Sequence, residues 1–152
     1  MSKTMRIMRG VPGSGKSFLA DSFMRDGYVI LSTDDIYEDR ARKEYLWSFE
    51  LLGLAHKMNQ MKADLACRRD IPLILIDNTN TTYKECKPYL DMAKKYGYEI
   101  VLTEPETDWF NNAAECFKRN SHGVPLETIQ RMIDRYEDSA DILEKHNAAN
   151  SR

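Results

Sequence analysis

The stretch Gly10-Val-Pro-Gly-Ser-Gly-Lys16-Ser17 decides the fold of this chain. It fits the pattern Gly-x-x-x-x-Gly-Lys-[Ser/Thr], in which a glycine-rich loop lies against phosphate groups. Phosphates approach backbone N–H groups closely only where side chains are missing, and glycine also adopts the backbone angles that such a loop requires. A helix that follows the loop adds its N-terminus, which favours an anion. We therefore predict that this chain binds a nucleoside triphosphate.

The residues of this phosphate loop have separate expected roles. Lys16 is expected to meet the outer phosphates, and the Ser17 hydroxyl to ligate Mg²⁺, so ATP and Mg²⁺ are the expected cofactors. The nucleotide contacts are expected from Gly10, Pro12, Gly13, Ser14, Gly15, Lys16, Ser17 and Phe18. The alternative is an incidental glycine turn between a strand and a helix. The apolar-leaning run at 5–9 and the helical pattern after the loop favour the first interpretation.

Length and composition limit the class of protein. The 152 residues are expected to form a single P-loop kinase domain over 1–146, followed by a frayed polar tail at 147–152. The formal net charge is -2, whereas most nucleic-acid binders are basic. A chain with this net charge can still carry a local basic patch. Cys67, Cys86 and Cys116 lack metal-ligand and redox spacing, which favours reduced thiols in a cytoplasmic protein. Without a long apolar run or an apolar signal core, no membrane partner is expected.

Strand and helix patterns alternate along the chain. Apolar runs predict strands at 5–9, 28–31, 72–77 and 98–102. Helices are predicted after the phosphate loop, over about 38–69, up to Tyr96 with Gly97 as C-cap, from about Asp108 to Arg119, and from Pro125 onward. The alternation predicts an α/β fold of the P-loop NTPase/kinase type, with a central four-stranded parallel sheet, helices on both faces and a helical lid.

Two of the predicted helices carry apolar stripes that are expected to face the core. The stripe on the helix at 38–69 consists of Leu51, Leu54, Met58, Met61 and Leu65. His56 lies on the same helix without a partner at ligand spacing and is expected to be structural. The last helix is expected to bury Leu126, Ile129, Met132, Ile133, Tyr136 and Leu143. Pro88 either lies in the first turn of its helix or kinks it.

Ligands of parallel sheets bind beyond the carboxyl ends of the strands, where four segments are expected to meet. These segments are the phosphate loop, Asp34-Asp35, the turn at 77–80 and the loop after 102. A carboxylate at the end of the second strand can accept the proton of an acceptor hydroxyl, so Asp34 is the expected general base. Asp35 is expected to be structural, and both residues also suit the N-cap of a following turn.

Asp77 and Arg9 are further candidates at this edge. Asp77 is expected to hold a Mg²⁺-bound water or to orient Ser17, unless the Asn-Thr-Asn that follows it makes only a polar turn. Arg9 is unusual in a buried strand, and we expect it either to pair with a carboxylate such as Asp77 or to reach the substrate.

The segment 118–125 joins two predicted helices and has the sequence of a mobile lid. Arg119, at the end of a helix, is expected to swing over the phosphates and to neutralise charge in the transition state. The alternative role for Arg119 is that of a cation that stabilises a helix C-terminus. His122, beside Gly123, is a weaker candidate for the site.

With these pieces placed, the sequence resembles the kinase domain of the polynucleotide kinase family of P-loop phosphotransferases. The resemblance rests on four motifs, which together span about 5–140: the phosphate loop, Ser32-Thr-Asp-Asp35, Ile76-Asp-Asn-Thr-Asn80 with the helix that follows, and Arg119-Asn-Ser-His-Gly-Val-Pro125. The resemblance implies transfer of the ATP γ-phosphate to a 5′-hydroxyl of DNA or RNA. It implies catalytic roles for Lys16, Asp34 and Arg119 and places Asp34, Asp35, Arg40, Asn78 and Asn80 near the acceptor.

Two departures from this family concern the acceptor. The phage kinases carry an arginine three residues after the base, where this chain has Tyr37, and Arg40 or Arg42 is the expected substitute. Their lid also carries a second arginine, for which His122 is the nearest counterpart.

Alternative functions follow from these departures and from the mild acidity of the chain. One is a kinase of a modified-base hydroxyl in DNA, which requires that base to be flipped out or exposed. A second is a small-molecule kinase, for a nucleoside or, in the manner of zeta toxins, a sugar nucleotide. A third is a non-enzymatic nucleotide-binding switch, against which Asp34 and Arg119 argue, because binding alone requires neither.

Overall fold

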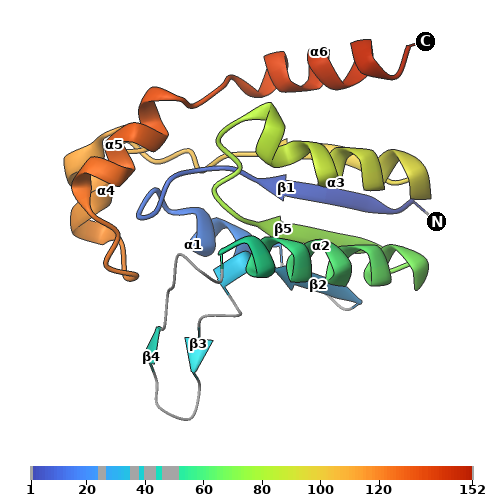
Figure 1. Ribbon diagram of the computed structural model, residues 1–152, viewed down its shortest axis with the longest axis horizontal. Coiled ribbons are helices and arrows are strands. Elements are labelled where there is room, and N and C mark those ends of the chain that lie inside the picture. Colours follow the sequence, from blue (N-terminus) through green and yellow to red (C-terminus); the bar gives the residue numbers. More distant parts are fainter. Residues whose placement is uncertain (1, 24–26, 35–37, 40–43, 46–51, 152) are drawn as a thin grey trace.

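A computed structural model describes residues 2–23, 27–34, 38–39, 44–45 and 52–151, with 38–39 and 44–45 described by their backbone alone. Four strands, β1 (Thr4–Met8), β2 (Tyr28–Leu31), β5 (Leu73–Asp77) and β6 (Glu99–Thr103), form a parallel sheet in the order β2-β5-β1-β6 (Figure 1). A separate antiparallel pair consists of β3 (Glu38–Asp39) and β4 (Glu44–Tyr45). The predicted α/β fold with a four-stranded parallel sheet is confirmed.

The strands of the sheet end nearly level with one another. Met8 of β1 lies opposite Asp77 of β5 and Thr103 of β6, and Leu31 of β2 lies opposite Ile76. The loops that leave the carboxyl ends of all four strands therefore start from one edge, as ligand-binding loops do in this class of sheet.

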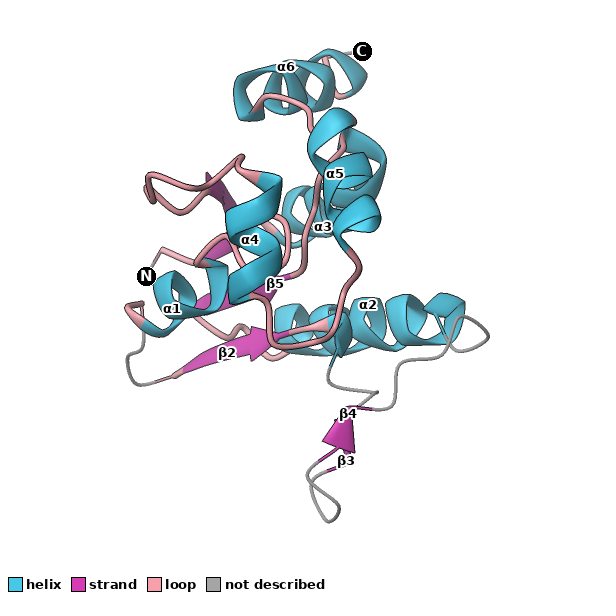
Figure 2. Ribbon diagram, turned by 90° about the vertical axis from the view of Figure 1, so that its left-hand side faces the viewer, coloured by secondary structure: helices cyan, strands magenta, loops and turns pink. Residues whose placement is uncertain are grey.

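Helices cover both faces of the sheet (Figure 2). On one face, α1 (Lys16–Asp21) packs through Ala20 and Leu19 against Met8, Leu73 and Leu75. On the other face, α2 (Leu52–Arg68), α3 (Tyr83–Tyr96) and α6 (Ser139–Ala149) pack around Met5, Ile7, Ile74 and Ile76. Neighbouring residues of a strand point to opposite faces, so a strand covered on both faces needs the continuous apolar run that β5 has.

The predicted helical lid is made of α4 (Ala113–Arg119) and α5 (Leu126–Asp134), which lie at the carboxyl edge of the sheet (Figure 1). The two helices share a small apolar cluster with the phosphate loop, which contains Val11, Cys116 and Ile129. The lid and the loop are therefore packed into one unit rather than joined by a hinge alone.

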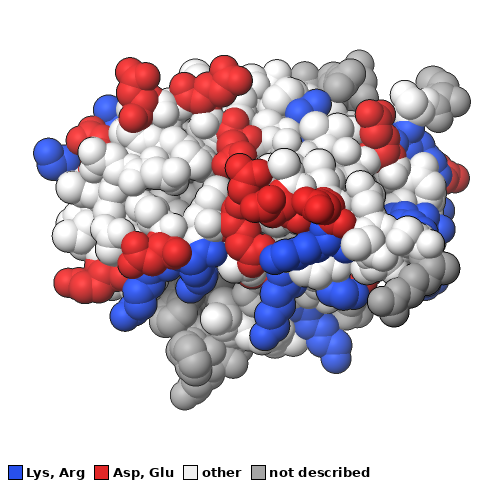
Figure 3. Space-filling view, turned by 90° about the horizontal axis from the view of Figure 1, so that it is seen from above, with Lys and Arg blue, Asp and Glu red and all other residues white. Residues whose placement is uncertain are grey.

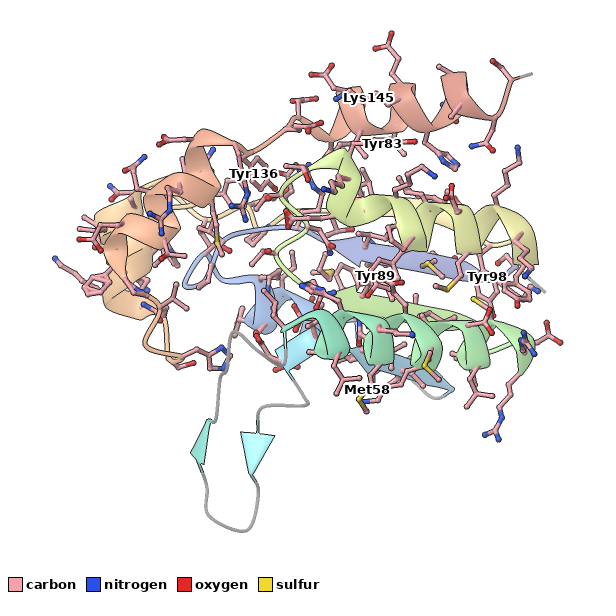
Figure 4. All side chains as sticks on the ribbon, viewed as in Figure 1. Met58, Tyr83, Tyr89, Tyr98, Tyr136 and Lys145 are labelled. Carbon is pink, nitrogen blue, oxygen red and sulfur yellow. The ribbon has the colours of Figure 1, made fainter. Side chains whose placement is uncertain are left out.

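The helix predicted over 38–69 is wrong in its first half and in the face that it buries. Its described residues form β3, β4 and α2, and Leu51 lies outside the described residues. On α2 the predicted core stripe of Leu54, Met58, Met61 and Leu65 is exposed, and Met58 points away from the sheet (Figure 4). The buried side chains are instead Ala55, Asn59, Ala63, Ala66 and Cys67. Small side chains let the helix axis approach the sheet closely, which is why they occupy the inner face.

Three boundaries in the C-terminal part also differ from the predictions. The N-cap of α4 is Asn112, whose side chain accepts from Glu115 N, and not Asp108. The predicted last helix is two helices, because the chain turns after Asp134 and Asp138 caps α6. Since α6 continues to Ala149, the chain is still helical at 147–149, where the frayed tail was expected. Pro88 lies inside α3, past its first turn, and Gly97 ends α3 with a positive φ of 74° as predicted.

No helix within the described ranges has the length and apolar character needed to cross a membrane.

Candidate functional site

The phosphate loop has a backbone that favours glycine at three points, Gly10, Gly13 and Gly15. Gly13 has a φ of 82°, and a Cβ built on it would lie 1.9 Å from the carbonyl oxygen of Cys116 on α4. Gly15 has a φ of 103° and forms the N-cap of α1. Because glycine has no side chain to accept from the first N–H groups of α1, those groups stay available to an anion.

The phosphate loop is braced from the predicted loop after 102, by two residues that the sequence analysis did not single out. Trp109 Nε1 donates to Gly13 O at 3.0 Å, and Thr107 Oγ1 donates to Ser14 O at 2.9 Å. Both donors lie in the connection between β6 and α4. A tryptophan and a threonine in the loop after the last strand were the available signal, since both can hydrogen-bond a backbone carbonyl. These two hydrogen bonds hold the carbonyl groups of Gly13 and Ser14 toward the connection that leads into the lid.

Lys16 and Asp77 form an ion pair at the end of β5. Lys16 Nζ lies 3.0 Å from Asp77 Oδ1, and both side chains are mostly buried. Asp77, whose carboxylate was expected to orient Ser17, is thus paired with Lys16. Ser17 and Phe18 are exposed on α1, and Phe18 has 85% of its surface accessible.

The donor set fits a nucleotide-bound magnesium ion rather than a metal held by protein alone. Among the described residues no group of three or more His, Cys, Asp or Glu side chains could hold a metal. Mg²⁺ commonly binds through one or two protein oxygens together with phosphate oxygens and water. Of the two residues predicted to serve in that way, Ser17 is exposed at the start of α1 and Asp77 is paired with Lys16, so their role at Mg²⁺ stays a prediction.

Asp34 follows β2 and meets the lid. One of its carboxylate oxygens lies 3.5 Å from His122 Nδ1, and its backbone N–H donates to Ser32 Oγ at 3.2 Å. His122 belongs to the connection between α4 and α5, so the lid reaches the side chain predicted to be the base. Asp35 and Arg40, and with them Tyr37 and Arg42, lie outside the described residues.

The two asparagines predicted to lie near the acceptor have different surroundings. Asn78 Oδ1 accepts from Thr33 N at 2.8 Å, which ties the turn after β5 to the residue before Asp34. Asn78 Nδ2 lies 3.4 Å from the hydroxyl of Tyr89, a buried residue of α3 (Figure 4). Asn80 is buried with a φ of 47°, and its amide donates to Met8 O at 2.7 Å. The side chain of Asn80 therefore helps to hold β1 in place, and its place near the acceptor stays a prediction.

Arg9 is a structural cation, contrary to both expectations for it. Its guanidinium is fully buried and donates to Asn80 O and Thr81 O after β5. It also donates to Glu137 O, between α5 and α6, and to Ser139 Oγ at the start of α6. It also lies 4.4 Å from the centre of the Tyr136 ring (Figure 4). A buried charge is tolerated when its donors are satisfied in this way. Burial, together with the hydrogen bond to Glu104, raises the pKa of Tyr136, which stays neutral.

Arg119 lies in the last turn of α4 beside the brace of the loop. Its Nε atom lies 2.9 Å from Glu115 Oε1, and its guanidinium carbon lies 3.7 Å from the centre of the Trp109 ring. The side chain remains half exposed. Because Trp109 itself bonds to Gly13, Arg119 is separated from the phosphate loop by one side chain.

Comparisons with known proteins identify a family and several relatives of this chain. The profile of a protein family described as an AAA domain matches residues 5–139. Human NEDD4-binding protein 2 is 42% identical over 133 residues, which cover 86% of this chain and 7% of that protein. The 2′,3′-cyclic-nucleotide 3′-phosphodiesterase of Mus musculus is 33% identical over 135 residues, which cover 86% of this chain and 30% of that protein. The chain therefore spans less than a third of either relative.

A solved structure has a similar fold. A chain in the structure of the Pnkp1/Rnl/Hen1 RNA repair complex superposes with a TM-score of 0.68 at 19% identity, over 95% of this chain and 46% of that one. An identity of 19% shows similarity of the fold alone. Both chains have a P-loop kinase-like fold.

Proposed function

Because the chain belongs to the AAA domain family over residues 5–139 and has a P-loop kinase-like fold, we propose that it is a kinase that uses ATP and Mg²⁺ to phosphorylate a hydroxyl of a nucleic acid. The proposed acceptor is the 5′-OH end of DNA or RNA. The observation that carries the proposal is that the Lys16–Asp77 pair and the Asp34–His122 contact both lie where parallel strands end. These are the places where a phosphate donor and a hydroxyl acceptor must meet.

Each group has a defined task in the proposed reaction. The N–H groups of the phosphate loop and Lys16 hold the outer phosphates, and Arg119 adds positive charge from the lid. Mg²⁺, when bound, neutralises the charge that builds between the β- and γ-phosphates. Asp34 accepts the proton of the acceptor hydroxyl while the hydroxyl oxygen bonds to the γ-phosphorus. The bond between the γ-phosphorus and the oxygen that bridges it to the β-phosphate breaks at the same time. ADP leaves, and the product is the acceptor with a new phosphate monoester.

One observation supports a nucleic-acid acceptor, and a second limits where it can bind. The names of two similar proteins refer to RNA repair and to cyclic nucleotides. The face shown from above in Figure 3 carries acidic side chains gathered near its middle, with basic side chains beside them, so it is poorly suited to a polyanion. We therefore place the acceptor near the turn after β5 and α2, whose side chains line a common pocket.

The test is transfer of labelled γ-phosphate from ATP to a panel of acceptors. The panel holds 5′-OH single- and double-stranded DNA and RNA, the same strands with 5′-phosphates, nucleosides and a sugar nucleotide. The proposal expects strong label only on the strands that have a 5′-OH end. Label on 5′-blocked DNA would instead indicate an internal or base hydroxyl, and label on small molecules alone a small-molecule kinase. Binding of ATP without any transfer would leave the switch as the function.

Two variants test the assignments within the site. Asp34→Asn is expected to lower kcat by about 10²–10⁴ while ATP binding remains, because only the proton acceptor is lost. Lys16→Ala is expected to abolish turnover or ATP binding. Circular dichroism and thermal unfolding serve as controls. If Asp34→Asn unfolds the protein, its role is that of a cap, and full activity of Lys16→Ala would exclude the assignment of the phosphate loop.

A further inference from the structure

A pocket of about 500 Å³ opens between the first half of α2 and the start of α3. Three segments line it: α2, the turn after β5 with the first turns of α3, and the residue that follows α5. The side chains that matter for its chemistry are His56, Gln60, Asn78, Thr82, Lys84 and Arg135. A pocket of this size accommodates one nucleotide unit.

The pocket begins one residue from the proposed base. Asn78, in its wall, accepts a hydrogen bond from Thr33 N at 2.8 Å, and His56 Nδ1 lies 3.4 Å from Thr33 Oγ1. Thr33 directly precedes Asp34. A polymer whose terminal hydroxyl is at Asp34 therefore has its next unit within reach of this pocket.

The charges on the pocket favour an anion at its α3 side. Lys84 is exposed in the first turn of α3, where the helix dipole also favours negative charge. Within the described part of the chain no carboxylate pairs with Lys84. The carboxylate of Glu85 is occupied, since it accepts from Thr81 and lies 3.9 Å from Arg135. A phosphodiester is thus met by a lysine and by the start of a helix.

The α2 side of the pocket offers hydrogen bonds rather than charge. Gln60 is half-buried in the wall, and no hydrogen bond within the described residues occupies its amide. A primary amide both donates and accepts, as the edges of nucleobases do. The exposed imidazole of His56 adds a planar surface beside it.

We propose that this pocket binds the second nucleotide of a 5′-OH polynucleotide, with the first internucleotide phosphodiester on Lys84 and the second base against Gln60. The proposal rests on the proposed function and names the acceptor more closely. The smallest efficient acceptor is then a dinucleotide rather than a nucleoside. The pocket also supplies a phosphate contact that does not depend on an arginine three residues after Asp34, where this chain has Tyr37.

The test compares acceptors of increasing length in matched variants. In the wild type, KM is expected to fall from a nucleoside to a 5′-OH dinucleotide. Lys84→Ala is expected to raise KM for the dinucleotide about tenfold, the loss expected for one charge-assisted hydrogen bond, with kcat and the nucleoside unaffected. The control is Lys87→Ala, one turn further along α3, whose lysine pairs with Asp91 and does not line the pocket. Gln60→Ala is expected to raise KM for the dinucleotide but not for the nucleoside.

The outcomes separate the pocket from the reaction. Equal effects of Lys84→Ala and Lys87→Ala on a polynucleotide would overturn the pocket while leaving the kinase in place. If the wild type phosphorylates no polynucleotide, the proposed function fails, and the pocket is then judged by equilibrium binding of a fluorescent 5′-OH dinucleotide. Weaker binding by Lys84→Ala than by Lys87→Ala would support the pocket, and equal binding would overturn it.

Discussion

At the scale of single residues, Arg119 has two possible roles, one catalytic and one structural, and each predicts a different effect of replacing it by alanine. If it serves catalysis, Arg119→Ala is expected to lower kcat by about 10²–10³ with a smaller change in KM for ATP, because its contact strengthens in the transition state. If it serves only Trp109 and Glu115, the loss is that of an exposed cation–π contact and surface ion pair, about 1 kcal/mol of stability. Steady-state kinetics with Lys118→Ala as the control separate the two, since both variants lose one cation from the end of α4. Equal kinetics for both variants would exclude the catalytic role.

Sequence reasoning is most informative for residues whose neighbours are close in the chain. Lys16 and Ser17 belong to a loop whose form depends on its own glycines, so spacing alone is informative. Arg9 was misjudged because its partners Thr81, Glu137 and Ser139 lie more than 70 residues away, and nothing local announces them. Asn80 looked available for the same reason, although its amide is used by Met8.

At the scale of elements, the packing of the phosphate loop on α4 predicts that Gly13→Ala destabilises the protein. The new Cβ would meet the Cys116 carbonyl at 1.9 Å, and the positive φ is unfavourable for alanine. We expect a loss of about 1–3 kcal/mol in the free energy of unfolding, measured by urea denaturation, together with weaker ATP binding.

A second glycine provides the control for that experiment. Gly53 lies in α2, and a Cβ there would meet nothing within 4 Å. Gly53→Ala is therefore expected to stabilise the protein, by up to about 1 kcal/mol, through helix propensity alone. A loss of stability in both variants, or in neither, would contradict the proposed packing of loop and lid.

The error over α2 has a general cause. Helical spacing shows that Leu54, Met58, Met61 and Leu65 share one face, but it does not say which face of the helix meets the sheet. The competing face carries Ala55, Ala63, Ala66 and Cys67, which are also apolar but small. A hydrophobicity pattern weights the large residues, whereas close packing of a helix on a sheet favours the small ones.

At the scale of the whole molecule, the attachment of α6 is expected to make stability depend on pH. Burial lowers the pKa of His146, whose ring is nearly inaccessible. The folded protein then binds fewer protons than the unfolded chain as pH falls through about 6.5, the ordinary pKa of histidine, so the free energy of unfolding decreases on the acid side. His146→Gln is expected to show a smaller fall in Tm between pH 7.5 and 5.5. An equal fall in both proteins would show that other groups are responsible.

The cysteines report on the integrity of the whole fold. Cys67, Cys86 and Cys116 are free and buried, and burial raises the pKa of Cys67 to about 11 and that of Cys86 to about 12. Because the thiolate is the reactive form, a colorimetric thiol reagent is expected to label the native protein slowly and all 3 cysteines after denaturation. Rapid labelling of the native protein at neutral pH would show that the core opens.

The overall fold was the part most open to prediction. A continuous apolar run such as that of β5 needs cover on both faces, and strands that alternate with helices require parallel pairing, so the class of fold follows from local patterns. The break at 135–138 and the place of Asn112 were not accessible in this way. They depend on Arg9 and on Trp109, whose contacts exist only once the sheet has formed.

The strand order has a consequence for how the chain is made. β1 is synthesised before the other strands of the sheet, yet it pairs with β5 and β6, so that Met5 must wait for Ile74 and then for Ile100. Neither pairing is available to a ribosome-bound chain that has not yet released β5. The central strand of the finished sheet is therefore an unprotected apolar segment during much of translation, and a natural target for a chaperone that binds nascent chains.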